Sequence, residues 1–215
     1  FYTMEMEAGQ QYWIGVPAGI RYQDMVSFKL LSPVGAKVSS DLSGGWWSNN
    51  YGYYYTAEQS GTYAIQIEGQ TYYDVYSGPS GVQAEFRRVS NNIQGYAFGE
   101  IKSGQASKPE EVNSYRFSIE NEKQVWVNVS GEYYQATLRK LDKNNTVIFE
   151  QNISGSDLHK FVSLLEGEYE LQLRPLTSKL SGFGTFNFQL QDRDALPVLP
   201  LDVPTIIKAD QSRAA

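Results

Sequence analysis

Hydrophobic and polar residues alternate along most of the chain. The alternation is regular in YTMEM (2–6), YAIQIEG (63–69), VWVNV (125–129) and FNFQL (186–190). A period of two residues is typical of a β-strand with one buried face, and apolar residues at helical spacing are scarce. Clusters of Gly, Asn, Ser and Asp separate the alternating segments, as turns between strands require. The pattern predicts an all-β protein.

The second half of the chain repeats the hydrophobic pattern of the first half. Tyr2 and Trp13 align with Tyr115 and Trp126, in each case 113 residues later. Internal repetition of this kind indicates two copies of one fold. We therefore expect Trp13 and Trp126 to occupy equivalent interior positions in two separate cores.

The separation between the two copies falls steadily along the chain. Phe28 aligns with Leu138, 110 residues later, and SGTYAIQIEG aligns with EGEYELQLRP, 106 residues later. The last strands of the two copies are 104 residues apart. Each loss falls in a predicted loop, which chance similarity would not arrange.

The repeat predicts two tandem domains and a tail. Residues 1–93 form the first β-sandwich repeat, which lacks its opening strand, and residues 94–194 form the second. GEIKSGQ (99–105) is similar to TIIKADQ (205–211). Residues 195–215 are therefore expected to be a Pro-rich extended linker and the first strand of a truncated third repeat. A frayed tail is the alternative, and pairing of this strand with the uncovered edge of the first repeat is a further hypothesis.

Composition narrows the classes of function. The 24 Asp and Glu residues outnumber the 18 Lys and Arg residues, and the resulting net charge of −6 disfavours nucleic acid as a partner. The chain has no Cys, which excludes disulfides and thiol chemistry. Its single His, His159, leaves almost no residues for a Ser-His-Asp triad or a multi-His metal centre. No apolar run approaches the roughly 18 residues of a membrane span, and no signal-peptide pattern is present. We expect a non-catalytic fragment of a longer protein.

The order of motifs resembles the bacterial pre-peptidase C-terminal (PPC) domain. The motifs are GEIKSGQ, YRFSI (115–119), VWVNV, EGEYELQL (166–173) and GFGTFNFQL (182–190). The Pro-rich linker and EAGQQYWIGV also look like the tandem repeats of very large secreted RTX-type and adhesin-like proteins. The resemblance implies antiparallel jelly-roll-like β-sandwiches of about eight strands each. It further implies a secreted or cell-surface bacterial protein in which the repeats adjoin neighbouring domains.

The resemblance also implies an optional calcium site. Some members of the family bind Ca²⁺ near the start of the domain through acidic side chains. The matching region here, KPEEVNSY (108–115), offers Glu110, Glu111 and Asn113 as metal ligands. Because Ca²⁺ takes roughly six to eight oxygen ligands, backbone carbonyls or water would have to supply the others. No cofactor is required.

Aromatic residues are concentrated in GGWWSNNYGYYYT (44–56). When this segment is aligned with the second repeat 106 residues later, Trp47 and Tyr55 fall on apolar residues and are expected in the core. The other four rings fall on Asn, Asp, His and Lys, so we expect an exposed patch that binds a partner. The predicted ligand-binding residues are Trp46, Tyr51, Tyr53 and Tyr54, extended by Tyr72, Tyr73 and Tyr76.

A glycan or a peptide is the expected ligand of this patch, and three alternatives to a ligand site stay open. The alignment can slip by one residue, which exchanges the inward and outward faces. The rings can pack across strands, or a neighbouring domain can cover them. The leading function is a non-catalytic accessory or spacer module of a large secreted bacterial protein. The alternative functions are a carbohydrate- or peptide-binding adhesin domain and part of a secreted hydrolase that uses carboxylates.

Overall fold

The computed structural model describes residues 2–15, 24–38, 42–44, 52–71, 85–154, 157–176 and 183–196. These residues form β-strands and one short 3₁₀ helix, Arg193–Ala195, and they contain no α-helix. The prediction of an all-β protein is confirmed. The Pro-rich segment and the predicted strand after residue 196 lie outside the described residues.

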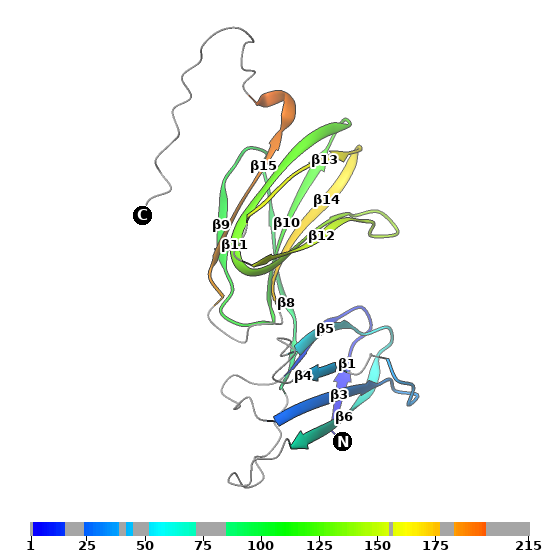
Figure 1. The fold of residues 1–215 in the computed structure, drawn as a ribbon. Helices are drawn as coiled ribbons and strands as arrows, with labels where there is room; N and C mark the ends of the chain where they lie inside the picture. Colours follow the sequence, from blue (N-terminus) through cyan, green and yellow to red (C-terminus); the bar gives the residue numbers. More distant parts are fainter. Residues whose placement is uncertain are drawn as a thin grey trace.

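The N-terminal part of the molecule, β1–β7, consists of two antiparallel sheets (Figure 1). One sheet has the order β1-β6-β3-β4 and the other has the order β5-β2-β7. Their core contains Ile14, Leu30, Tyr63 and Ile65, none of which is more than 1% exposed. The strand bounds are β1 Tyr2–Met6, β2 Gln11–Gly15, β3 Asp24–Leu31, β4 Leu42–Gly44, β5 Gly52–Thr56, β6 Gly61–Thr71 and β7 Glu85–Arg88.

The C-terminal part, β8–β15, is a sandwich whose two layers share the long strand β11. One layer has the order β12-β11-β14-β10-β8, and the other has the order β13-β11-β15-β9. The strand bounds are β8 Ser90–Gly95, β9 Lys102–Gln105, β10 Glu111–Ile119, β11 Lys123–Lys140, β12 Val147–Ser154, β13 Leu158–Leu164, β14 Gly167–Pro175 and β15 Thr185–Asp192.

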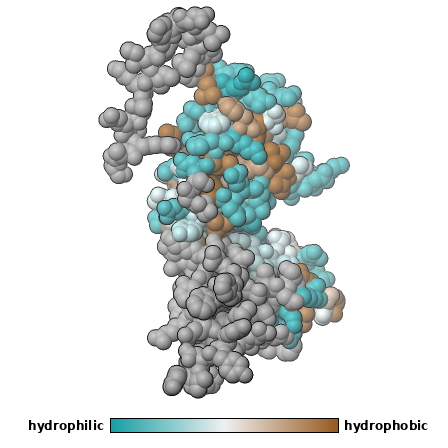
Figure 2. All heavy atoms as spheres, in the orientation of Figure 1, coloured by the Kyte–Doolittle hydropathy of each residue, from teal (hydrophilic) through white to brown (hydrophobic). Residues whose placement is uncertain are grey.

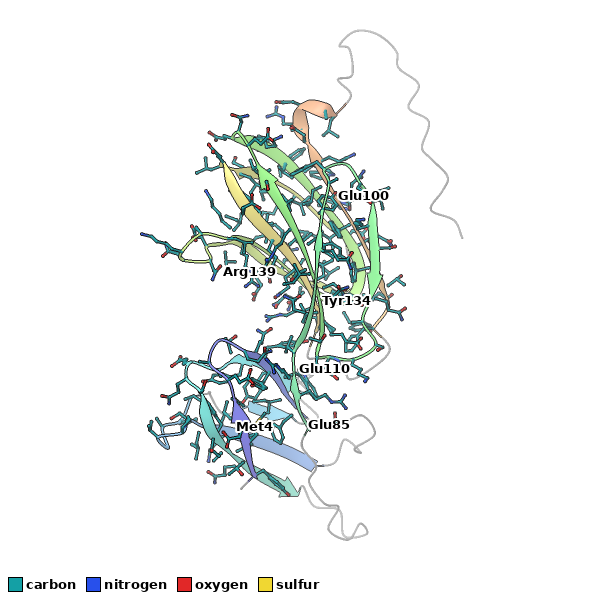
Figure 3. All side chains as sticks on the ribbon, turned by 180° about the vertical axis from the view of Figure 1, so that it is seen from behind. Met4, Glu85, Glu100, Glu110, Tyr134 and Arg139 are labelled. Atoms are coloured by element: carbon teal, nitrogen blue, oxygen red, sulfur yellow. The ribbon has the colours of Figure 1, made fainter. Side chains whose placement is uncertain are left out.

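Strand β11 changes layers at a bend. Tyr133 has a positive φ of 63°, and the register with β12 shifts between Glu132 and Tyr134. Bulges of this kind bend a strand and increase its twist, which lets one strand take part in both layers. Tyr134, at the bend, is fully buried in the interior of the C-terminal part (Figure 3).

Strands β1–β7 match β10–β15 in order and register, whereas β8 and β9 have no counterpart among the described strands of the N-terminal part. In the N-terminal part Met4 pairs with Tyr63, and in the C-terminal part Phe117 pairs with Tyr169. Gly61 and Gly167, two residues before these tyrosines, both have a φ of +146°, a conformation that favours glycine. This agreement is what the predicted internal repeat requires.

The Gly-x-Tyr motif performs the same structural task in both parts. The Tyr63 hydroxyl donates to the carbonyl oxygen of Gln59 at 3.1 Å, and the Tyr169 hydroxyl donates to that of Leu165 at 2.8 Å. Each bond ties the buried ring to the turn that precedes its strand. The motif therefore anchors a strand start, as the tyrosine corner of other β-sandwiches does.

One part of the predicted alignment is wrong by two residues. Leu30 pairs with Ile65 of β6, and Leu138 pairs with Leu171 of β14. Leu30, rather than Phe28, is therefore the counterpart of Leu138. A shift of two residues keeps the same face of the strand inward, so the hydrophobic pattern alone could not detect it.

The first strand of the C-terminal part departs from the expected antiparallel arrangement. Strand β8 pairs with β10 in parallel, with Glu111 opposite Ser90. Parallel neighbours need a long crossover, and residues 96–110 supply it by way of β9 in the other layer. The predicted domain boundary at residue 93 falls within β8, which lies where the two parts meet (Figure 1).

Hydrophobic side chains of the C-terminal part converge between its two layers. Its core includes Val125, Val127, Val129 and Leu190, none of which is exposed to solvent. On the visible face of this part, hydrophilic residues dominate and hydrophobic residues are interspersed among them (Figure 2).

Candidate functional site

The predicted site residues Tyr54 and Glu110 come together where the N-terminal and C-terminal parts meet. Tyr54 lies on β5 opposite Trp13 of β2, and Trp13 is in turn opposite Arg87 of β7. Because the flanking residues Tyr12 and Ile14 point into the core, Trp13 and its two cross-strand neighbours occupy the outer face of this sheet. This outer face is turned towards the C-terminal part.

A small apolar cluster fills the contact between the two parts. Trp13, Val89 and Val112 are buried together, with Tyr54 packed against them, and we call these four residues the junction cluster. Trp13 is only 1% exposed although it lies on an outer face. Its burial depends on Val112 of β10 and on Val89 of the connecting segment. Burial of this aromatic area is the main apolar contribution to the contact.

Gly52 allows the Trp13 indole to lie flat against the sheet. A Cβ atom placed on Gly52 would lie 2.8 Å from Cε2 and Cζ2 of Trp13 and 2.7 Å from the carbonyl oxygen of Ile14. These distances are shorter than van der Waals contact. Gly52 is therefore required by the close approach of the ring, rather than by its own backbone conformation.

The Tyr54 side chain is held by the C-terminal part from two sides. Its hydroxyl lies within hydrogen-bonding distance of the carbonyl oxygen of Pro109 and 3.0 Å from that of Pro175. The guanidinium of Arg174 lies over the ring, with Cζ 4.9 Å from the ring centroid, which is a cation–π contact. Burial raises the pKa of Tyr54 well above its usual value, and the nearby Arg174 only partly opposes this rise. The hydroxyl is therefore a neutral donor.

An ion pair crosses the junction beside the cluster. Arg87 Nη2 lies 2.7 Å from Glu85 Oε2, and Arg87 Nη1 lies 2.8 Å from Glu110 Oε1. The hydrogen bond to Glu110 raises the pKa of Arg87 above its usual value. Figure 3 shows Glu85 and Glu110 on the two sides of the junction. Arg87 therefore links the last strand of the N-terminal part to the start of β10.

Each of the three predicted calcium ligands has a polar partner within the chain. Glu110 pairs with Arg87, and Asn113 Oδ1 accepts a hydrogen bond of 3.3 Å from Asn92. Glu111 Oε2 accepts from the backbone N–H groups of Ser107 and Lys108. Although burial opposes it, these bonds hold the pKa of Glu111 below its usual value. No group of three or more His, Cys, Asp or Glu side chains suited to a metal occurs among the described residues. The role of these three side chains as calcium ligands stays a prediction.

The predicted aromatic patch is divided by the structure. Tyr53 packs against the core of the N-terminal part, whereas Tyr54 joins the junction cluster. The other predicted ligand-binding residues lie outside the described residues, and their role stays a prediction: Trp46, Tyr51, Tyr72, Tyr73 and Tyr76.

The alignment behind this patch is displaced by one residue. Trp13 pairs with Tyr54, and its counterpart Trp126 pairs with Phe161. Tyr54 therefore corresponds to Phe161 and not to Lys160, the polar residue that predicted an exposed ring. A slip of one residue exchanges the two faces of a strand, and the aromatic run at Tyr53–Tyr55 has no polar position that marks its register.

Trp126 does not occupy the interior position that the repeat predicts. Val125 and Val127 point into the core, so Trp126 lies between them on the outer face of β11. It contacts Phe161 and His159 of β13, with ring centroids 4.5 Å and 5.8 Å away. Sequence reasoning missed this cluster. The signal was available, because the strict alternation in VWVNV already requires the valines and the tryptophan to face opposite sides.

No protein-family model matches this chain, and no curated protein matches it. Among solved structures, the pre-peptidase C-terminal domain of a Bacillus anthracis collagenase is 17% identical over 49% of this chain and 98% of that chain, with a TM-score of 0.40. PliG from Aeromonas hydrophila, a periplasmic inhibitor of g-type lysozyme, is 11% identical over 47% of this chain and all of its own, with a TM-score of 0.35. The CUB1-EGF-CUB2 fragment of human MASP-1/3 is 9% identical over 88% of this chain and 91% of that chain, with a TM-score of 0.23.

Among the described residues, no helix has the length and apolar character that crossing a membrane would need.

Proposed function

We propose that the chain is a non-catalytic accessory module of a large secreted bacterial protein. Two PPC-like β-sandwiches, divided near the junction, act together as a spacer that holds neighbouring domains in a fixed relative orientation. The observation that carries the proposal is the seating of Tyr54 of the N-terminal part on Pro109, Pro175 and Arg174 of the C-terminal part.

The chemistry of the junction supports a rigid link. It combines a buried indole, a hydroxyl bonded to backbone carbonyl oxygen, a cation–π contact and an ion pair, each from a different pair of residues. A contact that is only apolar permits sliding, whereas directional bonds at several points oppose it. The connection through Val89 is also short, because β7 ends at Arg88 and β8 begins at Ser90. The motif resemblance to PPC repeats supports the setting within a larger secreted protein.

The test measures the relative motion of the two parts in the full chain. We expect ¹⁵N relaxation to give one common correlation time for both parts of the native protein. In Tyr54→Ala we expect two different correlation times and a larger radius of gyration in small-angle scattering. Tyr2→Ala, which removes a ring that is 58% exposed and outside the junction, is the matched control and should behave as the native chain does.

Two results would contradict the proposed role. Independent tumbling of the two parts in the native chain would exclude a rigid spacer. An unchanged correlation time in Tyr54→Ala would show that the Tyr54 contacts do not hold the junction.

A further inference from the structure

The outer face of the layer β13-β11-β15-β9 carries an aromatic cluster in which no residue is fully buried. Trp126 of β11 stacks on His159 of β13 with an angle of 6° between the rings. The Phe161 ring lies on the Trp126 ring as well, with an angle of 46° between these two planes. Phe161 is 49% exposed, and the His159 side chain is 44% exposed. We call these three residues the aromatic platform. Trp126 is partly buried, so Phe161 is the most exposed ring of the platform. Leaving such a ring open to water forgoes burial that is worth roughly 1.5–3 kcal/mol for a large apolar side chain.

The outward positions around the platform carry hydrogen-bonding groups without charge. Trp126 is paired with Gln191 of β15, and the next outward residue of β11, Asn128, is paired with Gln189. No Asp, Glu, Lys or Arg occupies the outward positions between 124 and 130 of β11, between 159 and 163 of β13, or between 185 and 191 of β15. The outward amides and hydroxyls of β11 and β15 are Gln124, Asn128, Ser130, Asn187, Gln189 and Gln191.

One carboxylate lies at the rim of the platform, beyond these positions. Asp157 precedes β13, and its Oδ2 atom is 3.8 Å from Nε2 of His159. This carboxylate stands beside the imidazole. The centre of the platform is therefore bordered by amides and hydroxyls.

The other layer of the same sandwich shows the opposite character. Its outer face carries Arg116 and Glu170, whose Nε and Oε2 atoms are 3.1 Å apart, and Arg139 lies near the same carboxylate. Glu170 is buried and Arg116 is half-exposed, so charged residues of the C-terminal part do occur on an outer sheet face. Their absence from the centre of the platform face is a property of that face and not of the composition of the chain.

The platform also lacks the groups that hold the junction. Its positions correspond to those of the docked face of the N-terminal part, where Trp13 matches Trp126. At the junction, the hydroxyl of Tyr54 and the guanidinium of Arg87 make the directional contacts. The C-terminal part has Phe161 and Gln191 at these two positions. A second domain could therefore not dock here through the contacts that the first pair of parts uses.

We propose that the aromatic platform and its flanking amides form a binding site for a neutral oligosaccharide. The rings present apolar faces to the C–H faces of pyranose units, while the amides of Asn187 and Gln191 pair with the hydroxyl groups. Gln124 and Gln189 already donate to Ser163 and to the carbonyl oxygen of Gly99, and Oδ1 of Asn128 is buried. Uncharged groups around the rings match a ligand without charge, because a charged partner would lose hydration here without gaining an ion pair. This inference is independent of the spacer role, which concerns the junction and not the platform face.

The test uses the full chain and a set of neutral hexasaccharides, namely cellohexaose, mannohexaose and chitohexaose, with hexagalacturonic acid as the charged comparison. The chain has a single histidine, so one set of imidazole NMR signals reports on the platform. We expect at least one neutral hexasaccharide to shift the His159 signals in a saturable manner. Calorimetric titration should show that Trp126→Ala weakens this binding by about tenfold or more, which corresponds to about 1.4 kcal/mol.

Two further variants separate binding from folding. Trp126→Phe keeps a ring at the position and should restore part of the affinity. Tyr2→Ala removes an exposed ring elsewhere and should leave the affinity unchanged. The histidine signals of the native chain give an answer even if a variant fails to fold.

Several results would overturn the proposal. These are an absence of shifts with every neutral hexasaccharide, binding that survives Trp126→Ala unchanged, and binding of the uronic acid oligomer alone. Self-association of the native chain that Trp126→Ala abolishes would also overturn it, because the platform would then be a protein interface.

Discussion

The Tyr54 hydroxyl is the group on which the junction depends most directly. Its oxygen lies within hydrogen-bonding distance of two prolyl carbonyl oxygens, so ionisation would place a phenolate against the negative ends of both carbonyl dipoles. Burial is the largest cause of the raised pKa of this group, and the carboxylate of Glu110 adds to it. Arg174 acts in the opposite direction. The neutral form is therefore the one that the folded chain prefers.

This preference predicts a loss of stability at alkaline pH. When the pKa of a group is higher in the folded than in the unfolded chain, its contribution to the stability of the fold is fully present at pH values below the unfolded pKa. For tyrosine the unfolded pKa is about 10. The stabilisation is lost as the pH rises above that value towards the folded pKa. We expect the difference in free energy of unfolding between the native chain and Tyr54→Phe to shrink between about pH 8 and pH 11. Denaturant titrations at both pH values measure it, and a difference that does not change with pH would contradict the assignment.

At the scale of the strands, the close approach of β5 to the Trp13 ring sets the tightest steric requirement. Gly52 and Gly15 face each other across the strand pair, and the indole of Trp13 covers Gly52. In the C-terminal part the counterpart of Gly52 is His159, whose ring stacks beside Trp126 instead of lying beneath it. The same pair of strands thus holds a flat, covered indole in one part and an open stack of rings in the other.

Gly52→Ala should therefore destabilise the N-terminal part. The new methyl group would displace the Trp13 ring or the strand itself, and overpacking of this kind costs roughly 1–3 kcal/mol. Gly95→Ala in β8 is the matched control, because no atom lies within 4 Å of a Cβ built there and its φ is not positive. Thermal unfolding of both variants gives the comparison. Equal melting temperatures for the two would show that the ring does not lie on Gly52.

At the scale of the whole molecule, the two parts use equivalent sheet faces in different ways. The face that contains Trp13 is buried against the C-terminal part, and the face that contains Trp126 is partly exposed and bordered by amides. A repeated domain can thus present the same face once as a contact within the chain and once as a surface for another molecule. Which of the two occurs depends on the side chains beside the tryptophan.

The two tryptophans should consequently differ in their contribution to stability, although the alignment places them at equivalent positions. Trp13→Ala should lower the free energy of unfolding by about 3–5 kcal/mol, as truncations of buried aromatic residues do. Trp126→Ala should lower it by less, about 1–2 kcal/mol, because this ring is only partly buried and packs against Phe161 and His159. Denaturant titration of both variants provides the measurement. A loss above about 3 kcal/mol for Trp126→Ala would place that ring in a core, contrary to the structure.

Much of the fold could be predicted from the sequence because the position of each strand and its inward face depend on residues that are close together in the chain. The alternation in segments such as VWVNV determines which residues face inward, and the paired Gly-x-Tyr motifs determine where equivalent strands begin. Both signals depend only on neighbouring residues. The candidate site was predicted less well, since the alignment slipped by one residue within Tyr53–Tyr55. Every position there is aromatic, so the hydrophobic pattern does not show which of these residues face inward.

The sequence by itself determined an all-β chain with a repeated strand order, because alternation and turn residues act over a few positions. Only the tertiary structure decided which outward faces are covered. Trp13 is buried by Val112, a residue about 100 positions further along the chain, and no local pattern encodes such a contact. The same physical reason explains why Tyr54 became part of a junction while Phe161 remained exposed and Trp126 partly exposed.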